Sequence, residues 1–234
     1  MKADRTNWEA RYRGGDRPHD GPPSELLRRW LPKAIPAGRR GPARTALDVA
    51  TGLGRNALLL ARAGYRVDAV DISPTALREA ARRARREGLR GICWIAADLD
   101  RWRPPRAHYD VVVNAFFLNR RLFPALRAAV RPGGVIVFET HLARDNDPGN
   151  SPPGRRFRLR PGELRRALRG WDMLYVKDGL GRTGRRVLAL GRIVARRPAT
   201  PAHSAGWSRP RGGVTRVRPP RTADRSGSSP GSSR

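Results

Sequence analysis

The stretch Leu47-Asp48-Val49-Ala50-Thr51-Gly52-Leu53-Gly54-Arg55-Asn56-Ala57 decides the fold of this chain. A short apolar run at residues 45–50 leads into a glycine-rich turn, and the turn opens a helical stretch at residues 55–64. Glycine permits a tight turn and lets the backbone approach a ligand closely. The first turn of the helix offers unpaired N–H groups and the positive end of its dipole. The sequence therefore predicts a strand–turn–helix unit that binds a ligand.

Strands and helices alternate along the rest of the chain. Strands are predicted at residues 45–50, 65–71, 91–97, 109–117, 135–142, 171–178 and 186–195, and helices at 55–64, 75–88, 119–130 and 161–169, with Arg131-Pro132-Gly133-Gly134 as a turn. This alternation predicts an α/β fold with a parallel sheet and helices on both faces. The last two strands are separated only by Gly-Leu-Gly-Arg-Thr-Gly, so we expect them to form an antiparallel hairpin at one end of the sheet.

The composition divides the chain into three parts. Residues 1–43 are predicted to form an amino-terminal helical cap segment, and residues 44–197 the α/β domain. Residues 198–234 consist mainly of Arg, Pro, Ser and Gly. Such a segment cannot bury enough apolar surface to offset the entropy lost on ordering, so we expect a disordered tail.

The chain is strongly basic, with 49 Lys and Arg against 20 Asp and Glu and a formal net charge of +29. A basic surface suits nucleic acid because it neutralises phosphates and releases counterions. However, only three of these cations are lysines, and Arg, Ala, Gly and Pro together are typical of a GC-rich genome. The charge is also scattered along the chain, and a surface field alone does not make a site. Nucleic acid therefore remains an alternative partner and is not favoured.

The single cysteine, Cys93, excludes a disulfide framework and zinc-finger spacing, and we expect no metal site. Its neighbours Ile92 and Trp94 suggest that Cys93 is a small residue of the buried core. No apolar run approaches the roughly 20 residues that a membrane span needs, and residues 1–16 lack the apolar region of a secretory signal. We expect a cytoplasmic monomer or homodimer that binds no membrane.

Three acidic residues stand where predicted strands meet the turns after them. Asp71 ends a strand nineteen residues after Gly52, and an acidic residue there can accept hydrogen bonds from both ribose hydroxyls. Asp98 ends the next strand and is placed to accept from an adenine amine. The segment Gly52–Ala57 also fits the dinucleotide fingerprint, so an NAD-dependent oxidoreductase is an alternative. Asp48 argues against it, because this carboxylate would repel a pyrophosphate but can hold an ammonium through water or backbone.

These residues, in this order, resemble the class I S-adenosylmethionine-dependent methyltransferases. The matching positions are Asp48, Gly52, Gly54, Asp71, Asp98 and the Arg131–Gly134 segment, with Ala50 where the family usually has glycine. The resemblance implies a Rossmann-like, doubly wound seven-stranded sheet in the order 3-2-1-4-5-7-6. It also implies that residues 44–197 are the methyltransferase domain and that the cofactor is S-adenosyl-L-methionine.

Further segments are similar to small bacterial methyltransferases that include the tellurite-resistance type. They are Trp8-Glu9-Ala10-Arg11-Tyr12, the Gly-Arg-Asn after the glycine turn, residues 117–124 and residues 159–164. Trp8 and Tyr12 share one helical face, so they either cover the cofactor as a lid or simply pack together. This resemblance does not identify the methyl acceptor.

The predicted site follows from the register of these motifs. Cofactor binding is assigned to Asp48, Ala50, Gly52, Gly54, Asn56, Asp71, Ile72, Asp98, Leu99 and Asn114, and the substrate wall and lid to Phe117 and Tyr12. Asn56 either faces the cofactor carboxylate or caps a helix, and Asn114 ends the fourth strand, where the methyl group must leave sulfur. His141 is the candidate general base, with an exposed loop histidine as the alternative.

The sequence therefore predicts in-line transfer of a methyl group to a small-molecule acceptor. An RNA or DNA methyltransferase that uses the basic surface is the first alternative. An NAD-dependent oxidoreductase and a non-catalytic RNA-binding module are further alternatives.

Overall fold

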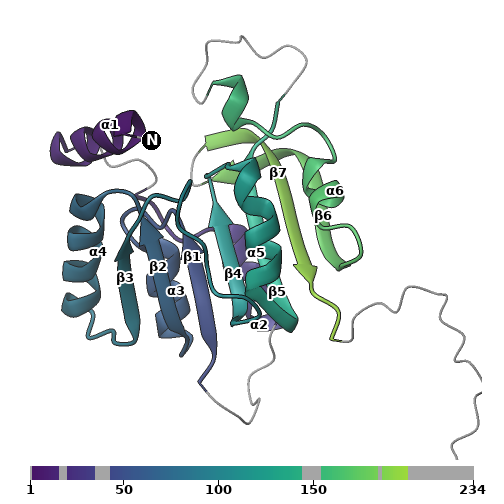
Figure 1. Cartoon of the computed structure of the whole chain (residues 1–234), viewed down its shortest axis with the longest axis horizontal. Coiled ribbons are helices and arrows are strands. Elements are labelled where there is room, and N and C mark those ends of the chain that lie inside the picture. The colour runs from purple at the N-terminus through teal and green to yellow at the C-terminus, as the bar shows by residue number, and fades with distance from the viewer. Residues whose placement is uncertain (1, 16–19, 35–42, 144–153, 184–185, 200–234) are drawn as a thin grey trace, which may run out of the picture. The chain divides into compact units, whose positions relative to one another are not determined.

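The sheet of the computed structural model has seven strands in the order β3-β2-β1-β4-β5-β7-β6 (Figure 1). The structure describes residues 2–15, 20–34, 43–143, 154–183 and 186–199, so the predicted tail lies almost wholly outside the described residues. The strands are β1 (Thr45–Val49), β2 (Arg66–Asp71), β3 (Ile92–Ala96), β4 (Tyr109–Ala115), β5 (Val130–His141), β6 (Asp172–Thr183) and β7 (Arg186–Arg196). Strands β1 to β5 pair in parallel, whereas β7 is antiparallel to both β5 and β6. The predicted order and the predicted hairpin are both confirmed.

Helices cover both faces of the sheet, as the alternation predicts. They are α1 (Lys2–Arg13), α2 (Glu25–Ala34), α3 (Arg55–Arg62), α4 (Pro74–Arg86), α5 (Phe123–Ala129) and α6 (Glu163–Ala167), with 3-10 turns η1 (Arg120–Leu122) and η2 (Arg155–Phe157). Leu27 of α2 and Leu60 of α3 belong to one apolar cluster, and Leu126 of α5 and Leu164 of α6 belong to the other. The sheet therefore separates two core layers.

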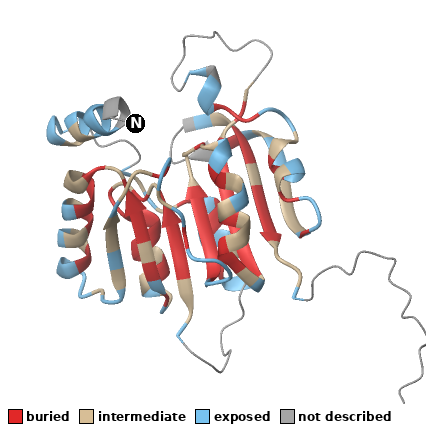
Figure 2. Cartoon of the chain, viewed as in Figure 1, coloured by how far each residue is buried: buried red, intermediate tan, exposed pale blue. Residues whose placement is uncertain are grey.

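Strand β4 shows why its sequence is continuously apolar. Val111 and Val113 join the cluster under α2 and α3, whereas Val112 joins the cluster under α5 and α6. Successive side chains of a strand point to opposite faces, so a central strand with helices on both sides buries nearly every residue. Figure 2 shows this burial along the central strands. The burial makes β4 a rigid support for the residues at its carboxyl end.

The segment Arg131–Gly134 is not the separate turn that the sequence predicts. Strand β5 already starts at Val130 and includes this segment, with an irregular register against β4 between Tyr109 and Val111. Arg131 forms an ion pair with the buried Asp110, and a Cβ on Gly134 would lie 2.9 Å from the Asp110 carbonyl oxygen. Small residues are needed here because two backbones approach closely, at the amino-terminal end of β5.

Two further expectations are corrected. The helix predicted at residues 119–130 divides into η1 and α5, with the Asn119 side chain capping the 3-10 turn. Cys93 is exposed rather than buried. Cys93 lies on β3, which is an edge strand of the sheet. The link from β3 to β4, residues 97–108, contains turns and no helix. Trp94 points to the other face and packs against the core, so alternation leaves Cys93 on the open face.

Within the described ranges, no helix has the length and apolar character needed to cross a bilayer. The same ranges contain no group of three or more His, Cys, Asp or Glu side chains arranged to hold a metal ion.

Candidate functional site

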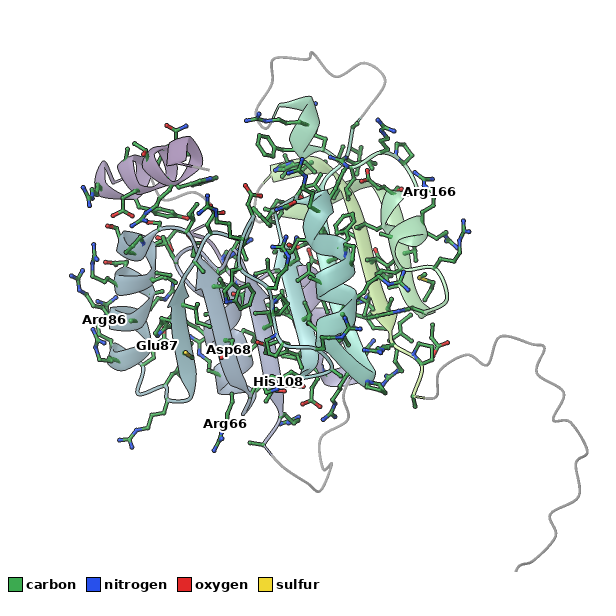
Figure 3. All side chains as sticks on the ribbon, viewed as in Figure 1. Arg66, Asp68, Arg86, Glu87, His108 and Arg166 are labelled. Atoms are coloured by element: carbon green, nitrogen blue, oxygen red, sulfur yellow. The ribbon has the colours of Figure 1, made fainter. Side chains whose placement is uncertain are left out.

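The predicted site residues gather at the edge of the sheet where the parallel strands end, which is the upper edge in Figure 1. Gly52 follows β1, Asp71 ends β2, Asp98 follows β3, and His141 ends β5. Ligands bind at this edge in open α/β sheets. His108, which Figure 3 labels at the opposite edge, precedes β4, so His141 is the histidine at the site edge within the described residues.

The Asp71 carboxylate links the end of β2 to the glycine-rich turn. Its Oδ2 accepts a 2.8 Å hydrogen bond from the Gly52 N–H, and its Oδ1 accepts one of 2.9 Å from the Ser73 N–H. Burial raises the pKa of Asp71, and the hydrogen bonds from the backbone of Ser73, Gly52 and Ile72 oppose that rise. The carboxylate is therefore held in one orientation at the head of the predicted ribose site, with Ile72 half-buried beside it.

Three residues of the turn adopt the left-handed conformation, with φ values of 52° at Ala50, 55° at Gly52 and 78° at Gly54. A Cβ on Gly52 would lie 2.9 Å from the Tyr12 hydroxyl, and one on Gly54 would lie 2.9 Å from the Trp94 ring. Gly54 is therefore required by space as well as by conformation, whereas at Gly52 the Tyr12 hydroxyl can shift and the conformation favours glycine. Ala50 adopts the same conformation with a side chain, which is strained.

Asp48 lies beneath the turn and is only 1% exposed. Its Oδ2 accepts a 2.5 Å hydrogen bond from the Thr51 hydroxyl, and the Ala57 N–H donates to the same carboxyl group. Burial raises the pKa of Asp48 to about 7. This geometry makes Asp48 a residue that holds the backbone of the turn, and any contact with a cofactor would pass through that backbone.

Asn56 lies apart from the Asp71 group. Its Oδ1 accepts a 2.9 Å hydrogen bond from the Ser24 N–H, which joins the first turn of α3 to the start of α2. Asp98 Oδ1 accepts from the Asp100 N–H at 2.9 Å, and the adjacent Leu99 is buried in the core. The structure therefore gives Asn56 a capping role between two helices, whereas Asp98 remains at the site edge.

The end of β4 forms the other half of the site. Asn114 donates a 2.7 Å hydrogen bond from Nδ2 to the Phe117 carbonyl, and its buried Oδ1 has no partner within the described residues. Phe116 has a φ of 60°, and its ring lies 5.4 Å from the His141 ring in an edge-to-face contact. A bulky residue in this conformation stores strain of the kind found at functional sites. Phe117 is half-buried beside it.

Sequence reasoning missed the role of Glu9 in α1. Its carboxylate accepts hydrogen bonds from the Ser73 hydroxyl at 2.6 Å and from the Thr75 side chain and backbone at 2.5 and 3.3 Å. Burial raises the pKa of Glu9, but the bonds from Ser73 and Thr75 and the charge of Arg13 outweigh it and lower the pKa to about 2. Glu9 thus fixes α1 to the start of α4. Its partners lie more than sixty positions away, so the only local signal was one acid in the Trp8–Tyr12 run.

Two buried charges were also missed. Arg55, the first residue of α3, is 8% exposed and donates to the Pro22 carbonyl at 3.0 Å. Glu139 of β5 is 5% exposed. Burial raises the pKa of Glu139, against a hydrogen bond from Ser24 and the charges of Arg55 and Arg192. In the sequence, Arg55 stands out as an arginine directly after the glycine-rich turn, and Glu139 stands out as one acidic residue in an apolar strand.

Comparison with known proteins agrees with this geometry. Residues 46–134 match the methyltransferase-domain family, and this segment runs from β1 through the start of β5. A curated relative, Hemagglutinin 1 of Eikenella corrodens, is 31% identical over 142 residues, which are 58% of this chain and 46% of the relative. The chain thus spans about half the length of the curated relative that it matches.

Three solved structures share the fold. One is described as "Conversion of a Disulfide Bond into a Thioacetal Group during Echinomycin Biosynthesis" (TM-score 0.62, 23% identity, 83% of this chain and 93% of that chain). The second is TehB from Haemophilus influenzae (TM-score 0.60, 20% identity, 74% and 61%). The third is an S-adenosylmethionine-dependent methyltransferase from Mesorhizobium loti (TM-score 0.53, 20% identity, 74% and 99%). Residues 46–134 therefore match a methyltransferase domain, and the chain shares its fold with a solved S-adenosylmethionine-dependent methyltransferase.

Proposed function

We propose that the protein transfers a methyl group from S-adenosyl-L-methionine to a small-molecule acceptor. The observation that carries the proposal is the Gly52–Asp71 hydrogen bond at the site edge, with Asp98 after β3 and Asn114 in β4. This arrangement presents a carboxylate for a ribose, an acidic residue for an adenine and an amide oxygen without a partner, all at the ends of adjacent strands.

The residues present fit this cofactor. Asp71 would accept from the ribose hydroxyls, and Asp98 from the adenine amine, with Ile72 beside the ring. The buried Oδ1 of Asn114 has no partner within the described residues and would accept from the ammonium group of the methionine part. An unsatisfied buried acceptor is costly, so a ligand donor at this place is favourable. Gly52 and Gly54 give the turn between β1 and α3 its left-handed backbone conformation.

When bound, the cofactor supplies a methyl group on a positively charged sulfur, which is already activated for displacement. The protein then has to align the acceptor and exclude water. Tyr12, held over Gly52 by α1, serves as the lid, and Phe117 serves as a wall of the acceptor side. His141 would take a proton from a hydroxyl or ammonium acceptor, whereas a thiolate would need no base.

A small acceptor is favoured by the enclosure of the reacting end. Asn114 is buried and Phe116 and Phe117 are half-buried at the end of β4, and α1 brings Tyr12 beside Gly52. The neighbour described by its conversion of a disulfide bond into a thioacetal group, and the resemblance to the tellurite-resistance type, favour a soft acceptor such as sulfur or tellurium.

Calorimetry and a turnover screen test this proposal. We expect S-adenosylmethionine to bind and NAD not to bind, and preferential NAD binding would refute the cofactor assignment. The screen then measures methyl transfer to thiols, tellurite, selenite, amines and bulk RNA. We expect transfer to a small molecule, and transfer to RNA alone would favour the nucleic-acid alternative. A gel shift at several salt concentrations, with and without residues 198–234, separates the tail from the domain.

A further inference from the structure

Strand β5 continues past the end of its neighbour β4. The last pairing between the two strands joins Ala115 to Glu139, and His141 lies beyond that pairing. The His141 carbonyl oxygen instead accepts a 2.8 Å hydrogen bond from the Leu159 N–H, and the Leu159 carbonyl oxygen accepts one of 2.8 Å from the Ala143 N–H. The position of His141 therefore depends on a segment that lies outside the seven strands of the sheet.

Arg120, the first residue of η1, holds this segment. Its Nη1 donates to the Arg156 carbonyl and its Nη2 to the Arg158 carbonyl, both at 2.8 Å. Its Nε and Nη2 also donate to the two carboxylate oxygens of Glu163, at 2.6 and 3.0 Å. One guanidinium thus directs its donors at residues 156–163, and Leu159 lies between the residues that it binds.

Glu163, the first residue of α6, keeps the Arg120 guanidinium in this orientation. Its side chain is 14% exposed, and its Oε2 also accepts a 2.8 Å hydrogen bond from the Arg160 N–H. Burial raises the pKa of Glu163, but the hydrogen bonds from Arg120 and Arg160 and the charges of both residues outweigh burial and lower the pKa. A carboxylate that binds an arginine through both oxygens fixes the geometry of the pair.

The residue before Arg120 fixes η1 to the cofactor side of the site. Asn119 Nδ2 donates a 2.8 Å hydrogen bond to Asp100 Oδ1, and the Asp100 N–H donates one of 2.9 Å to Asp98 Oδ1. The short turn η1 therefore connects the carboxylate at the proposed adenine position with the segment beside His141. Arg120 starts from a fixed place in the site and not from a free loop.

Arg120 contributes little to the apolar core. Its side chain is 42% exposed, whereas Leu122 of the same turn and Leu159 of the segment are each 1% exposed. Burial of apolar side chains supplies most of the stability of a fold, and hydrogen bonds to backbone groups fix orientation. Arg120 therefore affects where the segment lies beside His141 more than whether the chain folds.

We propose that Arg120 is a positioning residue for the acceptor half of the site, which acts through the Arg156 and Arg158 carbonyls to hold His141 in place. The inference rests on the proposed function, because His141 is the candidate base of that reaction. The His141 ring lies 5.4 Å from the Phe116 ring, so a displaced end of β5 changes the surroundings of the imidazole. This ring contact makes the effect of Arg120 observable without an acceptor.

NMR of the full chain compares the wild type with Arg120→Met, Arg120→Lys and the control Arg127→Met. Arg127 carries the same charge and also binds two carbonyls, those of Ala167 and Arg169, at 2.5 and 3.1 Å. These carbonyls precede the start of β6, at the edge of the sheet opposite His141. The control therefore loses comparable hydrogen bonds away from the site.

Two NMR measurements report on the segment and on the imidazole. The first is hydrogen exchange at the Leu159 and Ala143 amides, and the second is the ring C–H signals of His141, assigned with His141→Gln. Circular dichroism and urea unfolding show which variants fold. If Arg120→Met does not fold, Arg120→Lys tests the proposal, because lysine keeps the charge but cannot bind both carbonyls and the carboxylate at once.

Arg120→Met should speed exchange at Leu159 and Ala143 at least about tenfold, as expected for the loss of hydrogen bonds to a charged group. The His141 ring signals should move toward those of a free histidine peptide. Arg120→Lys should show the same changes to a smaller extent. Arg127→Met should leave the His141 signals in place and the two exchange rates within about twofold of wild type.

The turnover screen adds a functional measurement. If the wild type methylates an amine or a hydroxyl, Arg120→Met should lower the rate about tenfold or more, and adding His141→Gln should lower it no further than His141→Gln alone. Additive losses would overturn the proposal. If the acceptor is a thiol, the NMR measurements decide.

Wild-type exchange and wild-type His141 signals in a folded Arg120 variant would overturn the proposal, and so would equal changes in Arg127→Met. Failure of the wild type to bind S-adenosylhomocysteine in calorimetry would instead refute the proposed function. The NMR measurements need no cofactor, so they would still test Arg120.

Discussion

The Gly52 N–H donates a 2.8 Å hydrogen bond to Oδ2 of Asp71, and this bond joins the turn after β1 to the last residue of β2. The other carboxylate oxygen accepts from the Ser73 N–H at the start of α4. One side chain thus shapes the glycine-rich turn and faces the place where the proposed ribose lies. Because the site and the fold share this carboxylate, its replacement affects both.

Replacing Asp71 by alanine is expected to lower the affinity for S-adenosylmethionine by about a hundredfold or more, because two charge-assisted ribose hydrogen bonds are lost. Stability should fall by about 1–3 kcal/mol, since the Gly52 and Ser73 N–H groups lose their acceptor. Calorimetry and urea unfolding measure the two effects. Asp68→Asn, on the same strand but bonded to the Tyr109 hydroxyl, is the control and should keep its cofactor affinity. Unchanged affinity in Asp71→Ala would contradict the ribose assignment.

The buried carboxyl group of Asp48 makes stability depend on pH. Its pKa is raised from 3.8 to about 7 by burial, so the folded state binds a proton more tightly than the unfolded state does. The resulting stabilisation is present below about pH 4 and is lost as the pH rises through 7. Asparagine does not titrate, so the Asp48→Asn variant does not lose this stabilisation as the pH rises. We expect the free energy of unfolding of the variant, minus that of the wild type, to increase by about a few kcal/mol between pH 4 and 7. Urea unfolding at several pH values measures this difference, and a flat difference would contradict the assignment.

Ala50→Gly should stabilise the protein, by up to about 1 kcal/mol, because Ala50 has a φ of 52°. The gain is limited by the greater backbone freedom of glycine in the unfolded chain. Thermal unfolding measures the effect. Ala46→Gly, at a fully buried position of β1 without positive φ, is the matched control and should destabilise. Loss of stability in Ala50→Gly as large as in the control would show that Ala50 is not strained.

Glu9→Ala should release α1 from the start of α4, because the bonds to Ser73 and Thr75 are lost. We expect faster proteolysis within α1 and faster dissociation of the cofactor, measured by limited digestion and stopped-flow displacement. Glu79→Ala, which removes an acid paired with Arg82 on α4, is the control. The wild-type pKa of Glu9 is about 2, below its ordinary 4.5, so this attachment is present above pH 4.5 and is lost as the pH falls toward 2. Equal digestion of the two variants would argue against the role of Glu9.

His141→Gln should distinguish between acceptors. With an amine or hydroxyl acceptor we expect the rate to fall about a hundredfold, the lower range for loss of a general base. With a thiol acceptor we expect less than about a threefold change, because the thiolate needs no base. His108→Gln, at the opposite edge of the sheet, is the control in the turnover assay. An equal loss for all acceptors would mean that His141 supports Phe116, whose ring it contacts, rather than moving a proton.

Much of the fold follows from local patterns. The strand before Gly52, the caps at Ser73 and Gly54, and the short link between β6 and β7 each reflect the conformational preferences of neighbouring residues. The same patterns place Asp71 and Asp98 at strand ends. The boundaries of β5 and the exposure of Cys93 were predicted incorrectly, because both depend on what packs against the strand and not on the strand itself.

The sequence by itself determined the α/β architecture, the sheet order and the position of the acidic residues along the strands, since periodicity, turn residues and a family resemblance are all carried by short segments. Tertiary structure alone decided which side chains meet. Glu9 reaches Ser73, Asn56 caps Ser24, and Arg55 lies over Phe116. These contacts join segments distant along the chain, or depend on how helices pack on the sheet, and burial of their polar groups arises only when the layers close.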